Sequence, residues 1–290
     1  EAAIRDILKE EYFCRDDKVK LAMDVAKKEF SLTQGMQHER CANVYIGIPF
    51  CPTICAYCSF SSSPAGRYRD KMDAYLDALE KEMMQCEEWL AGKQMVSVYV
   101  GGGTPTSLSE EQFERLMAMT EKYLPMEQSK EFTVEAGRPD SITEGKLRSM
   151  KIHGVTRISI NPQSMKEHTL ELLGRKHTVE EIREKFMLAR TLGFDNINMD
   201  LIAGLPEETL EDFKETLREV EALKPDSITV HTLVIKRASR LRKEQLEQGG
   251  EMREEDACIE PMQKEAEQFC RVHGYEPYYT VSYTHLRAHE

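Results

Sequence analysis

Short runs of β-branched, aromatic and aliphatic residues recur along the chain and alternate with longer amphipathic stretches. Each run is apolar at most of its positions, which is the pattern of strands that are covered on both faces. The expected strands are 43–48, 96–100, 131–136, 156–161, 196–202 and 226–235. A later run, YEPYY at 275–279, is expected to begin one more strand.

Amphipathic helices are expected between these strands. Across 71–90, apolar side chains recur at the i, i+3, i+4 and i+7 spacing of a helix with one buried face, and Gly92 follows as a stop. Ser109 and Thr178 are each followed three residues later by Gln or Glu, the capping box that begins a helix. Six strands alternating with helices predict an α/β fold of parallel βα units with right-handed crossovers. A doubly wound sheet and a partial βα barrel fit this pattern equally well.

The two ends of the chain differ from this alternating region. Residues 1–40 carry no strand pattern and are expected to form a helical N-terminal extension before the α/β region at 41–240. Residues 241–279 are expected to start a C-terminal region, with a charged helix over 241–273. The last stretch, 280–290, fits none of the preceding patterns and is expected to be a foreign tail.

Composition narrows the class of protein. The 290 residues are 40% hydrophobic and 31% charged, which is typical of a globular chain with a sizeable core. No run approaches the ~18 apolar residues of a membrane span, and no secretory signal is visible, so the cytoplasm is the expected compartment. The net charge of −12 argues against general binding to nucleic acid, which needs a basic surface.

Three of the eight cysteines, Cys51, Cys55 and Cys58, lie together in the segment CPTICAYC. Their C-x3-C-x2-C spacing differs from the paired C-x2-C of zinc sites, and no histidine is near in sequence. Three thiolates on one loop suit a [4Fe–4S] cluster in which one iron has no protein ligand. An open metal position is normally where a substrate or cofactor binds. The other five cysteines are expected to be small buried apolar side chains.

Residues able to bind a ligand follow the ends of the expected strands. In a parallel βα barrel the chemistry lies at the C-terminal ends of the strands. From the second expected strand to the sixth, these positions hold the segment 101–104, Glu135, Gln163, Asp200 and Val234. Glycines allow close approach of the backbone, the polar side chains offer donors and acceptors, and Arg175 can fork onto a carboxylate. For each polar side chain, the structural alternative is a satisfied group at a strand end or a surface ion pair.

The motif CPTICAYC has the C-x3-C-x2-C form of the radical S-adenosylmethionine (SAM) enzymes. Together with YIGIPFC, VGGGTPTSL, RISINPQSM, LLGRKHT and NMDLIAGLPEET, it resembles the oxygen-independent coproporphyrinogen III oxidases, and most of all the branch called coproporphyrinogen dehydrogenase HemZ. The resemblance runs from about Tyr45 to Tyr279. It implies a partial (βα)6 TIM-like barrel of the radical SAM type, with a C-terminal region that is cut short relative to the family.

The same resemblance implies two cofactors, a [4Fe–4S] cluster and SAM. Cys51, Cys55 and Cys58 would hold the cluster, and the amino and carboxylate groups of SAM would chelate its remaining iron. The implied SAM contacts are Tyr45, Tyr57, Gly102, Gly103, Thr104, Glu135, Gln163, Arg175, Asp200 and Val234. On the hydrophobic pattern alone, Tyr45, Tyr57 and Val234 would be core residues, so their assignment rests on the resemblance. No residue is assigned a catalytic role.

The activity that the resemblance implies belongs to haem biosynthesis: oxidative decarboxylation of coproporphyrinogen III propionates to vinyl groups, giving protoporphyrinogen IX without oxygen. The implied partners are the porphyrinogen and an electron donor such as flavodoxin or ferredoxin. The alternative is a related haem chaperone, which keeps the same motifs and delivers haem. Those chaperones usually read YIHIPFC and GVQSF where this chain has YIGIPFC and NPQSM, which favours the oxidase. Two departures from many of the oxidases are Gly47 in place of His and Phe60 in place of a further Cys.

Overall fold

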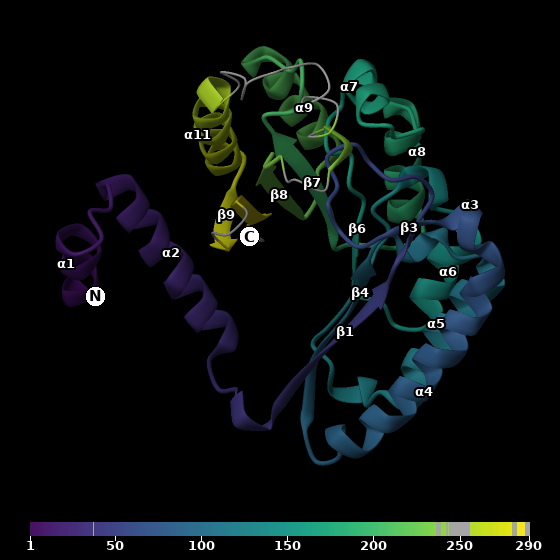
Figure 1. Ribbon diagram of the computed structural model, residues 1–290. Helices are drawn as coiled ribbons and strands as arrows, with labels where there is room; N and C mark the ends of the chain where they lie inside the picture. Colours follow the sequence, from purple (N-terminus) through teal and green to yellow (C-terminus); the bar gives the residue numbers. More distant parts are fainter. Residues whose placement is uncertain (37, 236–238, 242, 244–255, 280–282, 288–290) are drawn as a thin grey trace.

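The computed structural model describes residues 1–36, 38–235, 239–241, 243, 256–279 and 283–287 (Figure 1). Parts of the sequence predictions therefore lie outside the described residues. These parts are 236–238 and 242, the first half of the expected charged helix at 244–255, and 280–282 and 288–290 of the expected tail.

Six parallel strands form the main part of one sheet and follow each other in chain order. They are β1 (Cys41–Ile48), β4 (Gln94–Gly102), β5 (Glu131–Glu135), β6 (Arg157–Ser159), β7 (Ile197–Ala203) and β8 (Ser227–Thr232). All six were predicted from the sequence. The prediction of a partial βα barrel is confirmed, because the strands follow one another in chain order without the reversal of a doubly wound sheet, and the sheet does not close on itself within the described residues. The sixth strand is shorter than expected and ends at Thr232, so Val234 lies in the loop after it.

Helices follow the strands and cover one side of the sheet (Figure 1). They are α3 (Ala65–Tyr68), α4 (Met72–Leu90), α5 (Glu110–Tyr123), α6 (Glu144–Ile152), α7 (Glu167–Leu172), α8 (Val179–Thr191) and α9 (Leu210–Leu223). Short 3-10 turns lie at η1 (His38–Arg40), η2 (Arg69–Lys71), η3 (Pro105–Ser107), η4 (Met126–Gln128) and η5 (Pro139–Ser141). The capping boxes predicted at Ser109 and Thr178 are both formed, and Thr209 forms a third with Asp212.

The two faces of the sheet differ in polarity. Residues such as Val98, Val134 and Ile158 are fully buried in the apolar core beneath the helices. Their neighbours in the same strands, including Thr133 and Ser159, line a cavity on the other face. Successive side chains of a strand point to opposite faces, so the alternation places a polar set together inside the curve of the sheet. The expectation of strands that are apolar on both faces is therefore wrong for the inner face.

The N-terminal and C-terminal segments meet at the far edge of the sheet. The helices α1 (Ala2–Glu10) and α2 (Asp16–Thr33) confirm the helical N-terminal segment, and α2 packs against β9 (Tyr275–Tyr279), where Lys28 forms a 2.8 Å ion pair with Glu276. The helix α11 (Asp256–Val272) precedes β9 and forms the described part of the expected charged helix.

The strand β9 was predicted from YEPYY, but β10 (Tyr283–Arg287) was not predicted. The strand β10 pairs antiparallel with both β8 and β9, so part of the expected foreign tail belongs to the sheet. The edge of β8 offers unpaired backbone donors and acceptors, which any extended segment can satisfy. The origin of this tail stays a prediction. None of the helices in the described part of the chain combines the length and the apolar character that crossing a bilayer requires.

Candidate cofactor site

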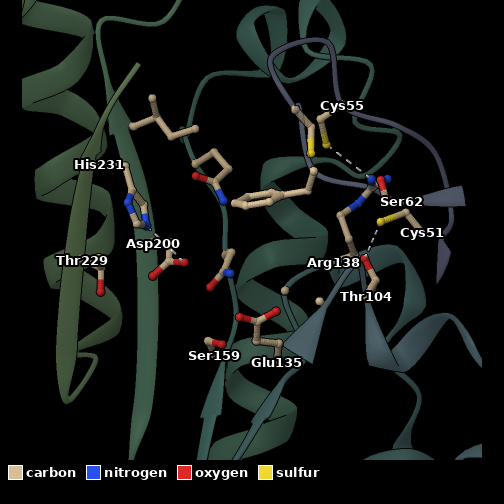
Figure 2. A pocket seen from close by; sticks show the side chains of 18 of the residues that line it. Cys51, Cys55, Ser62, Thr104, Glu135, Arg138, Ser159, Asp200, Thr229 and His231 are labelled. Atoms are coloured by element: carbon tan, nitrogen blue, oxygen red, sulfur yellow. Dashed lines mark hydrogen bonds and ion pairs between the residues drawn. The ribbon is translucent and has the colours of Figure 1, made fainter. Parts of the chain in front are cut away.

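A cavity of about 1060 Å³ lies on the inner face of the sheet. Its walls come from the C-terminal parts of the parallel strands, from the loops that follow them and from β9. It is lined by every residue that the sequence analysis selected: Tyr45, Cys51, Cys55, Tyr57, Cys58, Gly102, Gly103, Thr104, Glu135, Gln163, Arg175, Asp200 and Val234. Figure 2 shows five of these residues, the Cys51, Cys55, Thr104, Glu135 and Asp200 side chains, around the same space.

The cysteine loop begins at β2 (Phe50–Cys51), which pairs with β3 (Ser63–Pro64). One backbone and one side-chain hydrogen bond fix the loop to the segment after α7. The Ala56 amide donates to Leu173 O at 2.9 Å, and Thr53 Oγ1 donates to Gly174 O at 3.1 Å. These contacts hold the middle of the loop, which contains Cys55, and Cys51 and Cys58 lie on either side of it.

The surroundings of Cys55 favour a thiolate, whereas Cys51 and Cys58 need a metal to lose their protons. Cys55 is buried, and its Sγ accepts hydrogen bonds from the guanidinium groups of Arg138 and Arg175, each at 3.7 Å. Burial raises the pKa of the Cys51 and Cys58 thiols, so both would stay protonated without a metal. Metal coordination deprotonates a thiol outright. The donor set therefore fits an iron–sulfur cluster.

Among the described residues, no group of three or more His, Cys, Asp or Glu side chains is arranged around a single metal-ion position. This arrangement differs from a structural zinc site, in which four ligands surround one ion. In a [4Fe–4S] cluster each cysteine binds a different iron, so the three sulfurs do not need to converge on one point.

Three consecutive glycines, the last two residues of β4 and Gly103 after it, allow this segment to touch the cysteine loop. Gly102 has a φ of +107°, a backbone conformation that favours glycine. A Cβ at Gly103 would lie 2.8 Å from Phe50 O and 2.9 Å from Cys51 Sγ. The Thr104 amide donates to Phe50 O at 2.7 Å, and its Oγ1 donates to Cys51 Sγ at 3.5 Å (Figure 2). The glycines are thus required by the close approach of the two loops.

Acidic and polar groups line the opposite wall. Burial raises the pKa of Glu135 to about 7, and Tyr99 Oη donates a 2.6 Å hydrogen bond to it, which opposes that shift. Asp200 accepts a 2.6 Å hydrogen bond from Asn198 Nδ2 and lies 3.7 Å from His231 Nε2. The interaction with Asp200 raises the pKa of His231, which favours the charged imidazole that pairs with this carboxylate.

Three buried polar atoms on the cavity wall have no hydrogen-bond partner among the residues that the structure describes. They are Ser159 Oγ, Asn161 Oδ1 and Gln163 Oε1. An unsatisfied buried polar atom costs about 1–3 kcal/mol, so native proteins normally leave such atoms for a ligand or water. Together with Glu135 and Asp200, these atoms fit a ligand rich in hydroxyl and amino groups, such as the ribose and methionine parts of SAM.

Arg175 is placed differently from the expectation. It is 5% exposed, and its Nη2 donates to the carbonyl oxygens of Gly137 and Asn161. Its Nη1 approaches Cys55 Sγ and, at 3.4 Å, the hydroxyl of Tyr57. Only the Nη1 side therefore faces the cysteine loop, so a two-pronged grip on a carboxylate would require Arg175 to give up its carbonyl contacts.

The aromatic and aliphatic residues among the implied SAM contacts lie outside the main apolar core. Tyr45 and Val234 are 63% and 62% exposed and line the cavity, so the interpretation from hydrophobic pattern is wrong for both. Tyr57 is half-buried and packs against the small apolar cluster of Leu173, Ile202 and Leu205. The position of all three at the cavity agrees with the implication of the resemblance.

The sequence analysis missed several residues of this cavity. The polar ones include Tyr99, Thr133, Arg138, Arg157, Ser159, Asn198, Thr229 and His231. Seven of these eight lie in β4 to β8. Thr133 lies two positions before the selected Glu135, and Asn198 lies two positions before the selected Asp200, so each pair shares one face of its strand. The period of two in side-chain direction is the signal that identifies them once one residue of each strand is known to face inward. Arg138 follows its strand and carries no such signal.

Comparisons with known proteins agree with this geometry. Residues 45–220 match the family model described as the radical SAM superfamily. The chain is 41% identical over 276 residues to the oxygen-independent coproporphyrinogen-III oxidase-like protein HemZ of Bacillus subtilis (strain 168), covering 94% of this chain and 54% of that protein. It is 38% identical over 199 residues to the heme chaperone HemW of the same organism, covering 67% of this chain and 50% of that protein.

A solved structure is also similar. Coproporphyrinogen III oxidase (HemN) from Escherichia coli, described as a radical SAM enzyme, matches with a TM-score of 0.75 and 28% identity, over 87% of this chain and 56% of that chain. The chain therefore spans about half the length of the curated relatives and of the solved structure that it matches.

Proposed function

Because the chain belongs to the radical SAM superfamily, whose cofactors are a [4Fe–4S] cluster and SAM, we propose that it carries the active site of an oxygen-independent coproporphyrinogen III oxidase. The reaction would convert propionate side chains of coproporphyrinogen III to vinyl groups. The observation that carries the proposal is one cavity lined by the three cysteines, the glycine loop and three unsatisfied polar atoms of the fourth strand and its loop.

The cofactors supply one-electron chemistry when bound, through reductive cleavage of SAM and removal of a hydrogen atom from the substrate. The protein's own residues bind and orient them. Cys51, Cys55 and Cys58 hold the cluster on the loop after β1. Gly102 and Gly103 lie against that loop, which suits backbone contact with the methionine end of SAM.

The opposite wall suits the remaining polar groups of SAM. Glu135 and Asp200 carry carboxylates for hydroxyl and ammonium donors, and Gln163 Oε1 is a buried acceptor that no other described residue partners. A hydrogen bond between a charged group and a ligand in such a site is worth about 1.5–3 kcal/mol. In this proposal SAM would be held from both walls of the cavity, by the two loops on one side and by these polar groups on the other.

Exposed apolar side chains at the cavity support a large, partly apolar substrate. Tyr45, Phe60, Val234 and Tyr279 are 63%, 76%, 62% and 45% exposed and all line the cavity. Surface apolar groups gathered around a cavity usually mark a binding site. In this proposal Phe60 and Tyr279, which are not among the implied SAM contacts, pack against the ring of the porphyrinogen. We further propose an electron donor such as flavodoxin or ferredoxin. We also propose a cytoplasmic location, which is supported by the free thiols of Cys14, Cys41, Cys51, Cys55, Cys58, Cys86 and Cys270.

The second candidate function is haem delivery without oxidation. It is favoured by the 38% identity to a heme chaperone, because such a protein could use the same cavity. The segments YIGIPFC and NPQSM favour the oxidase, as does the higher identity of 41% to the oxidase-like relative.

An anaerobic assay separates the two functions. The reconstituted protein is incubated with SAM, dithionite and coproporphyrinogen III, and 5′-deoxyadenosine and vinyl products are measured, with haem binding followed in parallel. The oxidase proposal predicts both products and the loss of both in Cys55→Ala. Stoichiometric haem binding by cluster-loaded protein, without any vinyl product, would support the chaperone function and overturn the proposal.

A further inference from the structure

Two buried arginines approach the same cysteine sulfur. Arg138 and Arg175 are 4% and 5% exposed, and each directs Nη1 to Cys55 Sγ at 3.7 Å. Figure 2 shows the contact between Arg138 and Cys55. Buried arginines are rare unless they are paired, because removing a charge from water is costly. Arg175 is held by backbone carbonyl groups, whereas Arg138 has a different set of partners.

The backbone at Arg138 is fixed by the residue that follows. Pro139 disfavours the helical region for the preceding residue, and Arg138 has the extended values φ −122° and ψ 104°. Its side chain reaches the centre of the cysteine loop, where Nη1 donates to Thr53 O at 3.2 Å and Nη2 donates to Thr53 Oγ1 at 3.0 Å. Thr53 lies midway between Cys51 and Cys55, so Arg138 binds the loop between two of the predicted cluster ligands.

A carboxylate balances the charge from the far side. Asp140 accepts from Arg138 Nε at 3.1 Å and from Nη2 at 2.9 Å, a two-pronged pair that fixes the plane of the guanidinium. Burial acts to raise the pKa of Asp140, but His177 and Arg138 hold it at about 2, so this carboxylate stays ionised. The positive end of the pair faces Cys55, and the negative end faces away from it toward His177, 3.7 Å from Asp140.

We infer that Arg138 is a positioning residue of the cluster site, which fixes the cysteine loop through Thr53 and raises the reduction potential of the cluster through its charge beside Cys55. The inference rests on the proposed function, because it needs the cluster. Reduction adds negative charge to a cluster, and a buried positive charge next to a ligand sulfur stabilises the reduced form. Cluster potentials respond to net charge and to hydrogen bonds on the sulfurs in this way.

The test compares four variants of the whole chain after anaerobic reconstitution. Arg138→Gln removes the charge, Arg138→Lys keeps the charge and loses the fork, and Asp140→Asn leaves the Arg138 charge unbalanced. Arg115→Gln is the control, because Arg115 pairs with Asp77 and Glu80 on the helical side and lies outside the cavity. The reduction potential is measured by titration followed by electron paramagnetic resonance, and iron content and the thermal stability of the metal-free protein are recorded.

We expect Arg138→Gln to lower the reduction equilibrium constant at least tenfold, which is about 59 mV for one electron. Arg138→Lys should stay closer to wild type, Asp140→Asn should shift the potential in the opposite direction, and Arg115→Gln should not shift it. If Arg138→Gln cannot retain a cluster, the direction of the change in reduction potential in Asp140→Asn tests whether the Arg138 charge acts on the cluster. A higher potential supports the inference, and an unchanged or lower potential contradicts it.

Two results would overturn the inference. One is an unchanged potential in both Arg138→Gln and Asp140→Asn at full cluster occupancy. The other is a combination of three observations. Arg138→Gln and Arg138→Lys lose iron to the same extent, both lose the same thermal stability, and the reduction potential of Asp140→Asn is unchanged. This combination would show that Arg138 has only a structural role. A wild-type chain that assembles no [4Fe–4S] cluster would instead overturn the proposed function itself.

Discussion

The hydroxyl of Tyr99 donates a 2.6 Å hydrogen bond to Glu135 Oε1 within the cavity. Burial raises the pKa of Glu135 to about 7, and the nearby charge of Asp200 adds to this shift. The hydrogen bond from Tyr99 opposes the shift, because it stabilises the ionised carboxylate. Glu135 is therefore close to half ionised at neutral pH in the ligand-free protein.

Glu135 predicts a pH-dependent stability for the ligand-free protein. The pKa of Glu135 in the folded state lies above the ordinary value of 4.5. Its contribution to the free energy of unfolding is therefore fully present below pH 4.5 and is lost as the pH rises through about 7. The loss is on the order of 3 kcal/mol. In denaturation experiments from about pH 5 to about pH 8, wild type should lose stability relative to Glu135→Gln as the pH rises. Parallel curves for the two proteins would show that Glu135 does not titrate in this range.

The cavity wall predicts separate effects on SAM and on the cluster. Asp200→Ala and Glu135→Ala should each weaken SAM binding by about 1.5–3 kcal/mol, roughly ten- to a hundredfold, and leave cluster absorbance intact. Calorimetric titration of the reconstituted protein with SAM measures the effect. Glu114→Ala, on the outer helix α5, is the control. Unchanged affinity in both cavity variants would refute the assignment of this wall to SAM.

The cysteine loop predicts the ligands of the cluster. Anaerobic reconstitution should give about four irons and four sulfides per chain. Cys51→Ala, Cys55→Ala and Cys58→Ala should each abolish this, because each removes the ligand of one iron. Cys14→Ala should have no effect, since Cys14 lies before α2 and outside the cavity. Stoichiometric zinc in place of iron after the same treatment would contradict the assignment.

The contact between the two loops predicts a specific effect of a single methyl group. In Gly103→Ala, the new Cβ would meet Phe50 O at 2.8 Å and Cys51 Sγ at 2.9 Å, so the loops must separate. We expect a loss of about 1–3 kcal/mol in stability and reduced iron retention. Gly66→Ala is the matched control, because no atom lies within 4 Å of its added Cβ. Thermal melting and iron analysis should distinguish the two, and equal behaviour would mean that the loops tolerate separation.

Much of the fold follows from local patterns. The six parallel strands depend on residues close in sequence, and so do the helix capping boxes at Ser109 and Thr178. All of these predicted features are present in the structure. The strand β10 was missed because its pairing is set by the unpaired edges of β8 and β9 rather than by its own pattern.

The site was predictable only where spacing is itself the signal. The three cysteines lie within eight residues, and the glycines follow a strand directly, so their place at the cavity could be expected. The contact between Arg138 and Cys55 joins residues that are 83 positions apart, and it depends on the paths of two loops. Tyr45 and Val234 look like core residues, but the sheet curves and leaves its inner face open to the cavity.

The most direct test of the proposed function is to follow one hydrogen atom. Coproporphyrinogen III carrying deuterium at the β-carbon of its propionates is incubated anaerobically with the reconstituted protein, SAM and dithionite. The proposal predicts that deuterium appears in 5′-deoxyadenosine and that vinyl groups form in the same sample. Deoxyadenosine without deuterium, in the absence of vinyl product, would contradict it, because the cofactors would then react in this cavity without reaching the substrate.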